Sequence, residues 1–292
     1  MDIVITYVDG NDPVWQKDYE EYTAVPAMTK RYRDWGTLKY LLRGIQQKMP
    51  FIKNVFLVVS HESQVPAWAD RDNLKIVLHK DIIPQEHLPT FNSTTIEMFL
   101  HKIPGLDERF IYFNDDMFPV GNCDETLFFR DGKAVMGFSR HILVSGQYKK
   151  HCRNSDRLAR QAAGMKSSFI FVRPQHICSP MLKSRCEEVA AKTRESIISS
   201  LSRLRTDDNL NQYLFLDYML HKGDMIESRI PKKHFSLAAA GADSICKFLR
   251  KPTKALCCIN DVHLSENLFV STRDALLAAF EEIFPEKSRF EK

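Results

Sequence analysis

Two adjacent carboxylates, Asp115 and Asp116, follow an apolar stretch in the sequence FIYFNDDMFPV at residues 110–120. Two like charges beside a buried strand are costly unless a partner offsets them. Carboxylate oxygens are hard ligands that suit Mg²⁺ or Mn²⁺, and substrate phosphates complete the shell of such ions. Asp115 and Asp116 are therefore candidate metal ligands, with Asn114 beside the bound substrate. The alternative is a turn, because aspartate serves turns well.

A second polar cluster lies in the segment Asp9-Gly10-Asn11-Asp12-Pro13, directly after the strand-like residues 2–8. Asp9 and Asp12 stand where a nucleotide base, a ribose or a metal could bind, and Asn11 lies between them. The alternative is again a turn, in which Gly10 supplies backbone angles that other residues rarely adopt.

Other polar residues could contact a phosphate or a hydroxyl group. Arg31 and Arg33 in RYRD suit bidentate phosphate contacts, although they could equally be surface groups at a helix start. Asn92 and Ser93 offer neutral hydrogen-bonding groups before a predicted helix, where Ser93 could be the N-cap. His176 lies between two prolines in RPQHICSP. A histidine can take a proton from a hydroxyl nucleophile near neutral pH, and a structural role is the alternative.

The pair Asn260-Asp261 repeats the arrangement of Asn114-Asp115, since an amide and a carboxylate follow a short apolar stretch. Asp261 is thus a candidate for a further metal ligand. A helix cap is the alternative for this pair.

The elements that position these groups follow from the apolar pattern of the first 120 residues. We predict strands at 2–8, 54–60, 75–78 and 109–113, and helices at 35–48 and 94–102. This alternation is typical of an α/β fold with a mostly parallel sheet.

Ligands of such sheets bind outside the carboxyl ends of the strands. Three polar clusters follow three of the predicted strands, at residues 9–12, 60–62 and 114–116. Their convergence on one edge of the sheet is the strongest physical argument for a binding site.

The second half of the chain is less regular and more helical. It contains predicted helices at 150–164, 183–202, 209–222 and 272–284, after a hairpin around Asp131-Gly132. We predict a single catalytic unit over 1–292, in which an α/β nucleotide-sugar-binding part spans 1–140. The mixed, mainly helical part at 141–292 then completes the site.

The composition narrows the class of protein. The net charge of +4 over 292 residues does not suggest a nucleic-acid partner, for which concentrated basic stripes are expected. We find neither an apolar run long enough to cross a membrane nor a signal-peptide pattern at the N-terminus. Seven cysteines without a CxxC motif predict buried free thiols in a reducing compartment, so we expect a cytoplasmic protein.

Several stretches of the sequence resemble the Stealth family. They are DIVITYVDGNDPVW at the start, RYRDWGTLKYLLRGI, HLPTFNSTTIEMFLHKIPGLDERFIYFNDDMF, RPQHICSPMLKSRCEEV and CCINDV. The blocks follow in the family's order from residue 2 to about residue 262. The blocks at 2–15 and 88–118 are long and specific, whereas the last two are short.

The family includes bacterial capsular polysaccharide phosphotransferases and the animal N-acetylglucosamine-1-phosphotransferase of the lysosomal targeting pathway. The resemblance implies a Rossmann-like (GT-A-like) nucleotide-sugar-binding sheet and Mg²⁺ or Mn²⁺ as cofactor. It implies transfer of a hexose- or N-acetylhexosamine-1-phosphate from a UDP-sugar to a glycan or oligosaccharide hydroxyl, with release of UMP. The chain length and the lack of a membrane span are typical of the bacterial branch. Peripheral association with a membrane-bound capsule assembly machinery, at the inner face of the membrane, is a further expectation.

The resemblance lets us assign expected roles to the candidate residues. We expect His176, Asp116 and Asp9 to be catalytic, and Asp115, Asp116 and Asp261 to hold the metal. The expected substrate-binding residues are Asn11, Asp12, Arg31, Arg33, Asn92, Ser93 and Asn114. Two other function classes stay open: a metal-dependent glycosyltransferase that releases UDP, and a non-catalytic nucleotide-sugar or glycan-binding module.

Overall fold

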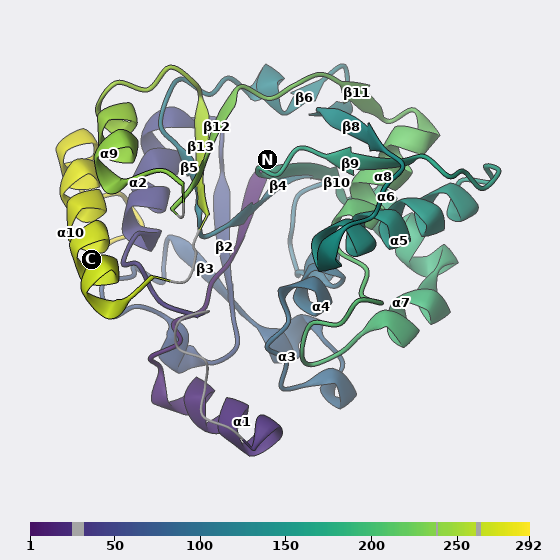
Figure 1. The fold of residues 1–292 in the computed structure, drawn as a ribbon, viewed down its shortest axis with the longest axis horizontal. Coiled ribbons are helices and arrows are strands. Elements are labelled where there is room, and N and C mark those ends of the chain that lie inside the picture. Colours follow the sequence, from purple (N-terminus) through teal and green to yellow (C-terminus); the bar gives the residue numbers. More distant parts are fainter. Residues whose placement is uncertain (25–31, 238, 261–263) are drawn as a thin grey trace. The chain divides into compact units, whose positions relative to one another are not determined.

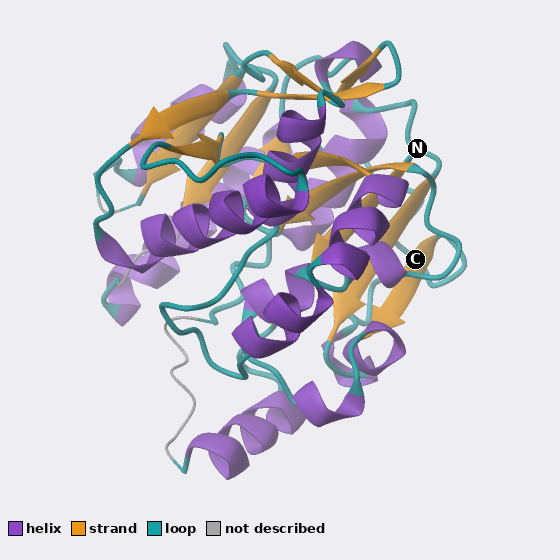
Figure 2. Cartoon of the chain, turned by 90° about the vertical axis from the view of Figure 1, so that its right-hand side faces the viewer, coloured by secondary structure: helices purple, strands orange, loops and turns teal. Residues whose placement is uncertain are grey.

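The computed structural model describes residues 1–24, 32–237, 239–260 and 264–292, which contain both helices and strands (Figures 1 and 2). The chain forms two compact units whose segments are interleaved in the sequence. Unit 1 comprises Met1–Val4, Val77–Tyr112 and Glu125–Ile230, and unit 2 comprises Ile5–Ile76, Phe113–Asp124 and Pro231–Lys292. The predicted division into an α/β nucleotide-sugar-binding part at 1–140 and a mainly helical part at 141–292 stays a proposal.

A five-stranded sheet has the strand order β10-β4-β1-β2-β3. Its strands are β1 (Asp2–Thr6), β2 (Asn54–Val59), β3 (Leu74–Leu78), β4 (Arg109–Asn114) and β10 (Ser179–Leu182). The interior residues of β2 and β4 are buried, as their continuous apolar runs require. The predicted α/β class with a mostly parallel sheet is confirmed. One strand of this sheet, β10, was not predicted. It pairs antiparallel with β4, with Ser179 opposite Tyr112.

Unit 1 holds most of the helices that follow β3. They are α3 (His79–Ile82), α4 (Ser93–Glu97), α5 (Gly146–Ala162), α6 (Lys183–Lys192), α7 (Arg194–Ser200) and α8 (Tyr213–Lys222), with the 3-10 helices η3 (Gln85–His87), η4 (Leu100–Lys102) and η5 (Glu125–Leu127). The predicted helix at 94–102 is therefore divided into α4 and η4, and the one at 183–202 is interrupted at Thr193.

Short strands complete unit 1. They are β6 (Phe129–Arg130), β7 (Lys133–Met136), β8 (Phe138–His141), β9 (Phe171–Pro174) and β11 (Met225–Glu227), arranged as the sheets β11-β7-β6 and β8-β9. The predicted hairpin around Asp131-Gly132 is confirmed, because β6 and β7 pair antiparallel across these two residues.

Unit 2 contains a second α/β arrangement around a short sheet of order β12-β13-β5. Its elements, besides β2, are α1 (Pro13–Thr23), α2 (Leu38–Lys48), η2 (Glu62–Gln64), β5 (Met117–Pro119), β12 (Lys232–Ser236), α9 (Ala242–Arg250), β13 (Leu256–Asn260) and α10 (Glu266–Ile283). Helices α9 and α10 lie side by side (Figure 1). The helix predicted at 272–284 is confirmed as α10, which begins earlier, at Glu266.

Helix α2 and strand β5 approach each other closely in unit 2. The apolar residues of α2 that the periodicity singles out, Leu38, Leu41, Leu42 and Ile45, are all buried. A Cβ atom at Gly44 would lie 2.7 Å from the carbonyl oxygen of Pro119. Gly44 therefore allows the helix to contact the strand that follows the Asp115-Asp116 turn.

A buried ion pair ties α2 to the C-terminal residues of unit 2. The Arg43 Nε and Nη2 atoms donate to the two carboxylate oxygens of Glu291 at 2.9 and 2.8 Å, and Nη1 donates to the Phe284 carbonyl at 2.7 Å. The side chains of Arg43 and Glu291 are only 6% and 5% exposed. Arg43 also pairs with the half-exposed Glu281 at 3.2 Å, whereas Arg43 is the cation that compensates the buried Glu291.

We expect Arg43→Met to lower the free energy of unfolding by about 3–5 kcal/mol, because it leaves Glu291 as an uncompensated buried charge. Arg250→Met is the matched control, since Arg250 pairs with Glu282 through the same two-bond geometry at half-exposed positions. Because solvent screens that exposed pair, its loss should change the stability little. Denaturant unfolding of both variants gives the comparison, and equal losses would contradict the role of burial.

All seven cysteines lie in the described part of the chain, and each is buried and outside any disulfide, as predicted. Among the described residues, none of the helices combines the length and the apolar character needed to cross a membrane.

Candidate active site

The turn after β1 is held by its own polar side chains. The Asp9 carboxylate accepts hydrogen bonds from the Asn11 backbone N–H at 2.8 Å and from its Nδ2 at 3.1 Å. Asp12 is the N-cap of α1 and accepts from the Val14 N–H at 3.2 Å. Asn11 therefore orients Asp9, and Asp12 has a structural role whether or not it also binds a substrate.

Gly10 is required in this turn for a reason that differs from the one suggested by the sequence. It is not among the glycines with positive φ, so the expectation of unusual backbone angles is wrong. Its N–H donates to the Tyr32 carbonyl at 2.7 Å, and a Cβ atom would lie 2.4 Å from that oxygen. The close approach brings Tyr32 against the first polar cluster.

The polar residues after β2 contact the same turn. Gln64, which is 2% exposed, accepts from the Asp9 N–H at 2.6 Å and donates to the Asp12 carboxylate at 2.9 Å. The Ser63 hydroxyl donates to the same Asp12 oxygen as Gln64, Oδ2, at 2.8 Å. The first two polar strand ends therefore meet within unit 2, through Gln64, which the sequence did not single out.

The charges of three carboxylates act on the buried Tyr7, which directly follows β1. Burial, together with the charges of Asp34, Asp9 and Asp115 and a hydrogen bond to Asp34, raises the pKa of Tyr7 far above its usual value. Burial also raises the pKa of Asp34, whose carboxylate accepts from the Gly36 N–H at 2.9 Å. The third polar cluster therefore shares the neighbourhood of the first, and Asp34 joins the site although the sequence drew attention only to the neighbouring arginines.

Asp115 and Asp116 form the turn between β4 and β5, and Asp116 is fixed by β13. The Ile259 N–H donates to the Asp116 carbonyl at 2.9 Å, and the Cys258 thiol donates to its carboxylate at 3.3 Å. Burial and the Asp116 charge raise the pKa of the Cys258 thiol well above its usual range. Cys258 is thus a protonated donor, a role that the sequence did not reveal.

We expect Cys258→Ala to lower kcat/KM about fivefold, because it removes a hydrogen bond of roughly 1 kcal/mol that orients Asp116. Cys258→Ser keeps a donor at this position and should restore most of the activity. Cys257→Ala is the control, since successive side chains of a strand point to opposite faces and Cys257 is equally buried. A similar loss in Cys257→Ala would contradict the orienting role.

Of the remaining candidate residues of unit 2, the structure describes Arg33 and Asn114. Arg33 donates to Glu266 at 2.7 Å, and its guanidinium lies 4.3 Å from the Phe269 ring centre. A phosphate would have to replace Glu266 as its partner. Asn114 is the last residue of β4, directly before the two aspartates. Arg31 and Asp261 lie outside the described residues.

His176, Asn92 and Ser93 belong to unit 1. His176 lies in the loop between β9 and β10, and its ring lies edge-on to the Tyr148 ring at 6.0 Å. The Tyr148 hydroxyl is 2.7 Å from that of Tyr213, a fully buried residue of α8. The histidine therefore stands beside an exposed tyrosine, Tyr148, whose hydroxyl is held by the buried Tyr213.

Asn92 and Ser93 are built into the start of α4. Asn92, rather than Ser93, is the N-cap, because its side chain accepts from the Thr94 N–H at 3.2 Å. Its Nδ2 atom donates to Asn209 at 3.0 Å, and the residue is 1% exposed. Ser93 accepts from Arg205 at 2.6 Å. The N-cap alternative for Ser93 is thus wrong, and a substrate role for Asn92 would require displacing several partners.

The donor set of unit 2 fits a hard divalent cation. Asp9, Asp34 and Asp115 all act electrostatically on Tyr7, Asp116 follows Asp115 directly, and all of these offer carboxylate oxygens. Mg²⁺ and Mn²⁺ prefer such oxygen ligands, and Mg²⁺ sites commonly use one or two carboxylates together with substrate phosphates. Cys258 adds a neutral hydrogen-bond donor instead of a thiolate ligand.

Comparisons with known proteins show which proteins this chain is similar to. Residues 31–136 match the family model "Stealth protein CR2, conserved region 2". The chain is 30% identical to the capsular polysaccharide phosphotransferase WcwK of Streptococcus pneumoniae, over 100% of this chain and 99% of that protein. It is also 30% identical to the receptor polysaccharide phosphotransferase WefC of Streptococcus oralis, with the same coverage.

A solved structure of the galactosyltransferase LgtC aligns over 94% of this chain and 96% of that one, with 10% identity and a TM-score of 0.41, a likeness too low to carry an argument. The relatives of near-equal length are decisive instead. From the matching second conserved region and the similarity to these phosphotransferases along its whole length, it follows that the chain belongs to the Stealth family.

Proposed function

We propose that this protein transfers a hexose- or N-acetylhexosamine-1-phosphate from a UDP-sugar to a glycan hydroxyl in the synthesis of a capsular or cell-surface polysaccharide. Its relatives along the whole chain are named phosphotransferases, which supports a transferase of this kind. The observation that carries the proposal is the Asp115-Asp116 turn at the end of β4, where the Asp116 carboxylate is held by Cys258 and where the charges of Asp9, Asp34 and Asp115 all act on Tyr7. Such a cluster suits a diphosphate that is bound together with a cation.

In the proposed reaction the acceptor oxygen forms a bond to the β-phosphorus of the donor, and the bond from that phosphorus to the bridging oxygen breaks. UMP leaves with this oxygen, and the product is a phosphodiester. His176 takes the proton of the acceptor hydroxyl. A cation bound by Asp115 and Asp116 would neutralise the charge that develops on the leaving phosphate.

The other residues of the proposed site hold and orient the substrate. Asp9, with Asn11 as its hydrogen-bond partner, would lie next to the nucleotide or the sugar. Arg31 or Arg33 would contact the phosphates, as guanidinium groups do in many phosphate sites. Catalysis of this kind consists of positioning and charge neutralisation. We further propose a cytoplasmic location at the inner face of the membrane, where a membrane-bound assembly machinery could receive the product.

The test is an incubation with a panel of UDP-sugars, Mg²⁺ or Mn²⁺, and an oligosaccharide acceptor. We expect UMP as the released nucleotide and a phosphodiester signal in the ³¹P NMR spectrum of the product. Release of UDP would instead establish a glycosyltransferase, which breaks the anomeric carbon–oxygen bond. Donor binding without metal-dependent release of any nucleotide would establish a binding module.

A further inference from the structure

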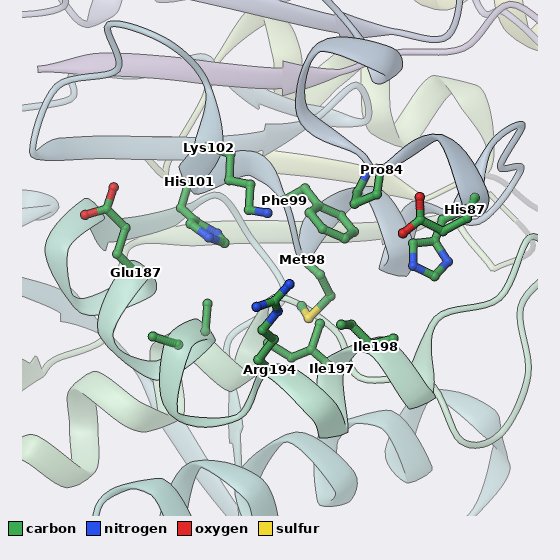
Figure 3. Close-up of a pocket in the computed structure, with 13 residues that line it drawn as sticks. Pro84, His87, Met98, Phe99, His101, Lys102, Glu187, Arg194, Ile197 and Ile198 are labelled. Carbon is green, nitrogen blue, oxygen red and sulfur yellow. The ribbon is translucent and has the colours of Figure 1, made fainter.

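A pocket of about 410 Å³ lies within unit 1, and none of its lining residues is a candidate active-site residue (Figure 3). Its walls come from the start of η3, from residues 98–102 and from the facing turns of α6 and α7. This volume is in the usual range of small-molecule sites, which are mostly apolar with a few convergent polar groups.

One part of the pocket is apolar. Met98, Phe99 and Ile197 are buried side chains of its wall, and Ile198 is 45% exposed beside them. Figure 3 shows these residues grouped with Pro84 on one side of the cavity. An exposed isoleucine next to buried apolar groups gives an apolar chain a continuous surface to cover.

The other part of the pocket carries polar groups that point into it. His101 is 4% exposed, and its Nδ1 atom is buried without a hydrogen-bond partner among the described residues. Burial lowers the pKa of His101 to about 4, so the ring is neutral at neutral pH. A buried polar atom of this kind is costly unless a ligand or water satisfies it.

The charges around His101 favour an anion. Figure 3 shows the Lys102 and Arg194 side chains directed toward the middle of the cavity from opposite walls. Glu187 also lines the pocket, but it forms an ion pair with Lys183. Glu86 is the other carboxylate of the lining, in the η3 segment next to His87. Among the lining residues, the cations Lys102 and Arg194 therefore outnumber Glu86, the one carboxylate outside the Glu187–Lys183 ion pair.

We propose that this pocket binds a single-chain amphiphile with an anionic head group, a phosphate monoester or a carboxylate. The apolar chain lies against Met98, Phe99 and Ile197. The head group lies between Lys102 and Arg194, within reach of the His101 ring. Arginine suits both kinds of head group, because its guanidinium donates two parallel hydrogen bonds to a phosphate or a carboxylate.

The proposal is tested by isothermal titration calorimetry on the whole protein with octyl phosphate, octanoate, 1-octanol and octyltrimethylammonium, each below its micelle concentration. We expect one molecule of octyl phosphate or octanoate to bind per chain. The cationic amphiphile should bind at least about tenfold more weakly, as expected from the loss of a charged hydrogen bond. A preference between the two anions identifies the head group.

Two variants and two controls assign the binding to this pocket. Arg194→Gln changes an exposed residue and should weaken both anions about tenfold while leaving 1-octanol unchanged. Ala190→Phe should fill the pocket and weaken all ligands. Arg153→Gln and Ala162→Phe are the same changes on α5 and should have no effect. Unchanged binding in both pocket variants, equal binding of the cation, or binding that does not saturate near one molecule per chain would overturn the proposal.

Discussion

Asp116→Asn is expected to lower kcat about 10³-fold or more at saturating Mg²⁺, since removing one preorganised electrostatic group from such a site has effects of this size. The amide keeps an oxygen that can accept the Cys258 thiol hydrogen, and the backbone bond from Ile259 is unaffected. The substitution therefore removes a charge with little change of shape. The measurement is the rate of nucleotide release from a UDP-sugar.

A second readout separates metal binding from catalysis. Titration of Mn²⁺ into the protein, followed by electron paramagnetic resonance, should show weaker binding for Asp116→Asn than for the unchanged protein. Asp115→Asn, measured in parallel, shows which of the two carboxylates contributes more. Normal turnover and normal Mn²⁺ affinity in Asp116→Asn would rule out its role as a ligand.

Asp131→Asn is the matched control for these variants. Asp131 lies in the β6–β7 hairpin with a φ of 52°, a conformation that asparagine tolerates well. The change of charge is the same, but the residue is exposed and outside the candidate site. We expect unchanged activity and an unfolding free energy within about 0.5 kcal/mol of the original.

The elements that were predictable from the sequence are those with strong local signals. Strands β2 and β4 have continuous apolar runs, and helix α2 has apolar residues at helical spacing. Helix α1 was missed, because the turn residues before it dominated the interpretation. The Asp12-Pro13 pair is nevertheless a standard helix start, with an N-cap aspartate and proline at the first position.

The contacts that complete the site are not local, and no periodicity reveals them. Cys258 and Asp116 are 142 residues apart and meet only because β13 pairs with β5, with Cys258 opposite Met117. Asp34 acts on Tyr7 from a part of the sequence that no local pattern connects with β1. The polar residues at strand ends could be predicted, because the α/β pattern itself implies where they gather.

The second large expected effect concerns His176, the proposed general base. His176→Gln should lower kcat by about 10²–10⁴-fold, which is the usual contribution of general base catalysis. The KM for the UDP-sugar should change little, because the proposed role of His176 concerns the acceptor hydroxyl. Steady-state kinetics with varied donor and varied acceptor give both values.

The pH dependence of the reaction distinguishes a base from a structural residue. Protonation of the base abolishes its function, so activity of the unchanged protein should fall toward acidic pH, and this limb should disappear in His176→Gln. Tyr148→Phe keeps the ring beside His176 but removes its hydroxyl contact with Tyr213, and should retain the acidic limb. His141→Gln, on β8 of the same unit, should behave like the unchanged protein. If His176→Gln raises only the KM for the acceptor and keeps the acidic limb, the histidine binds the acceptor and another group accepts the proton.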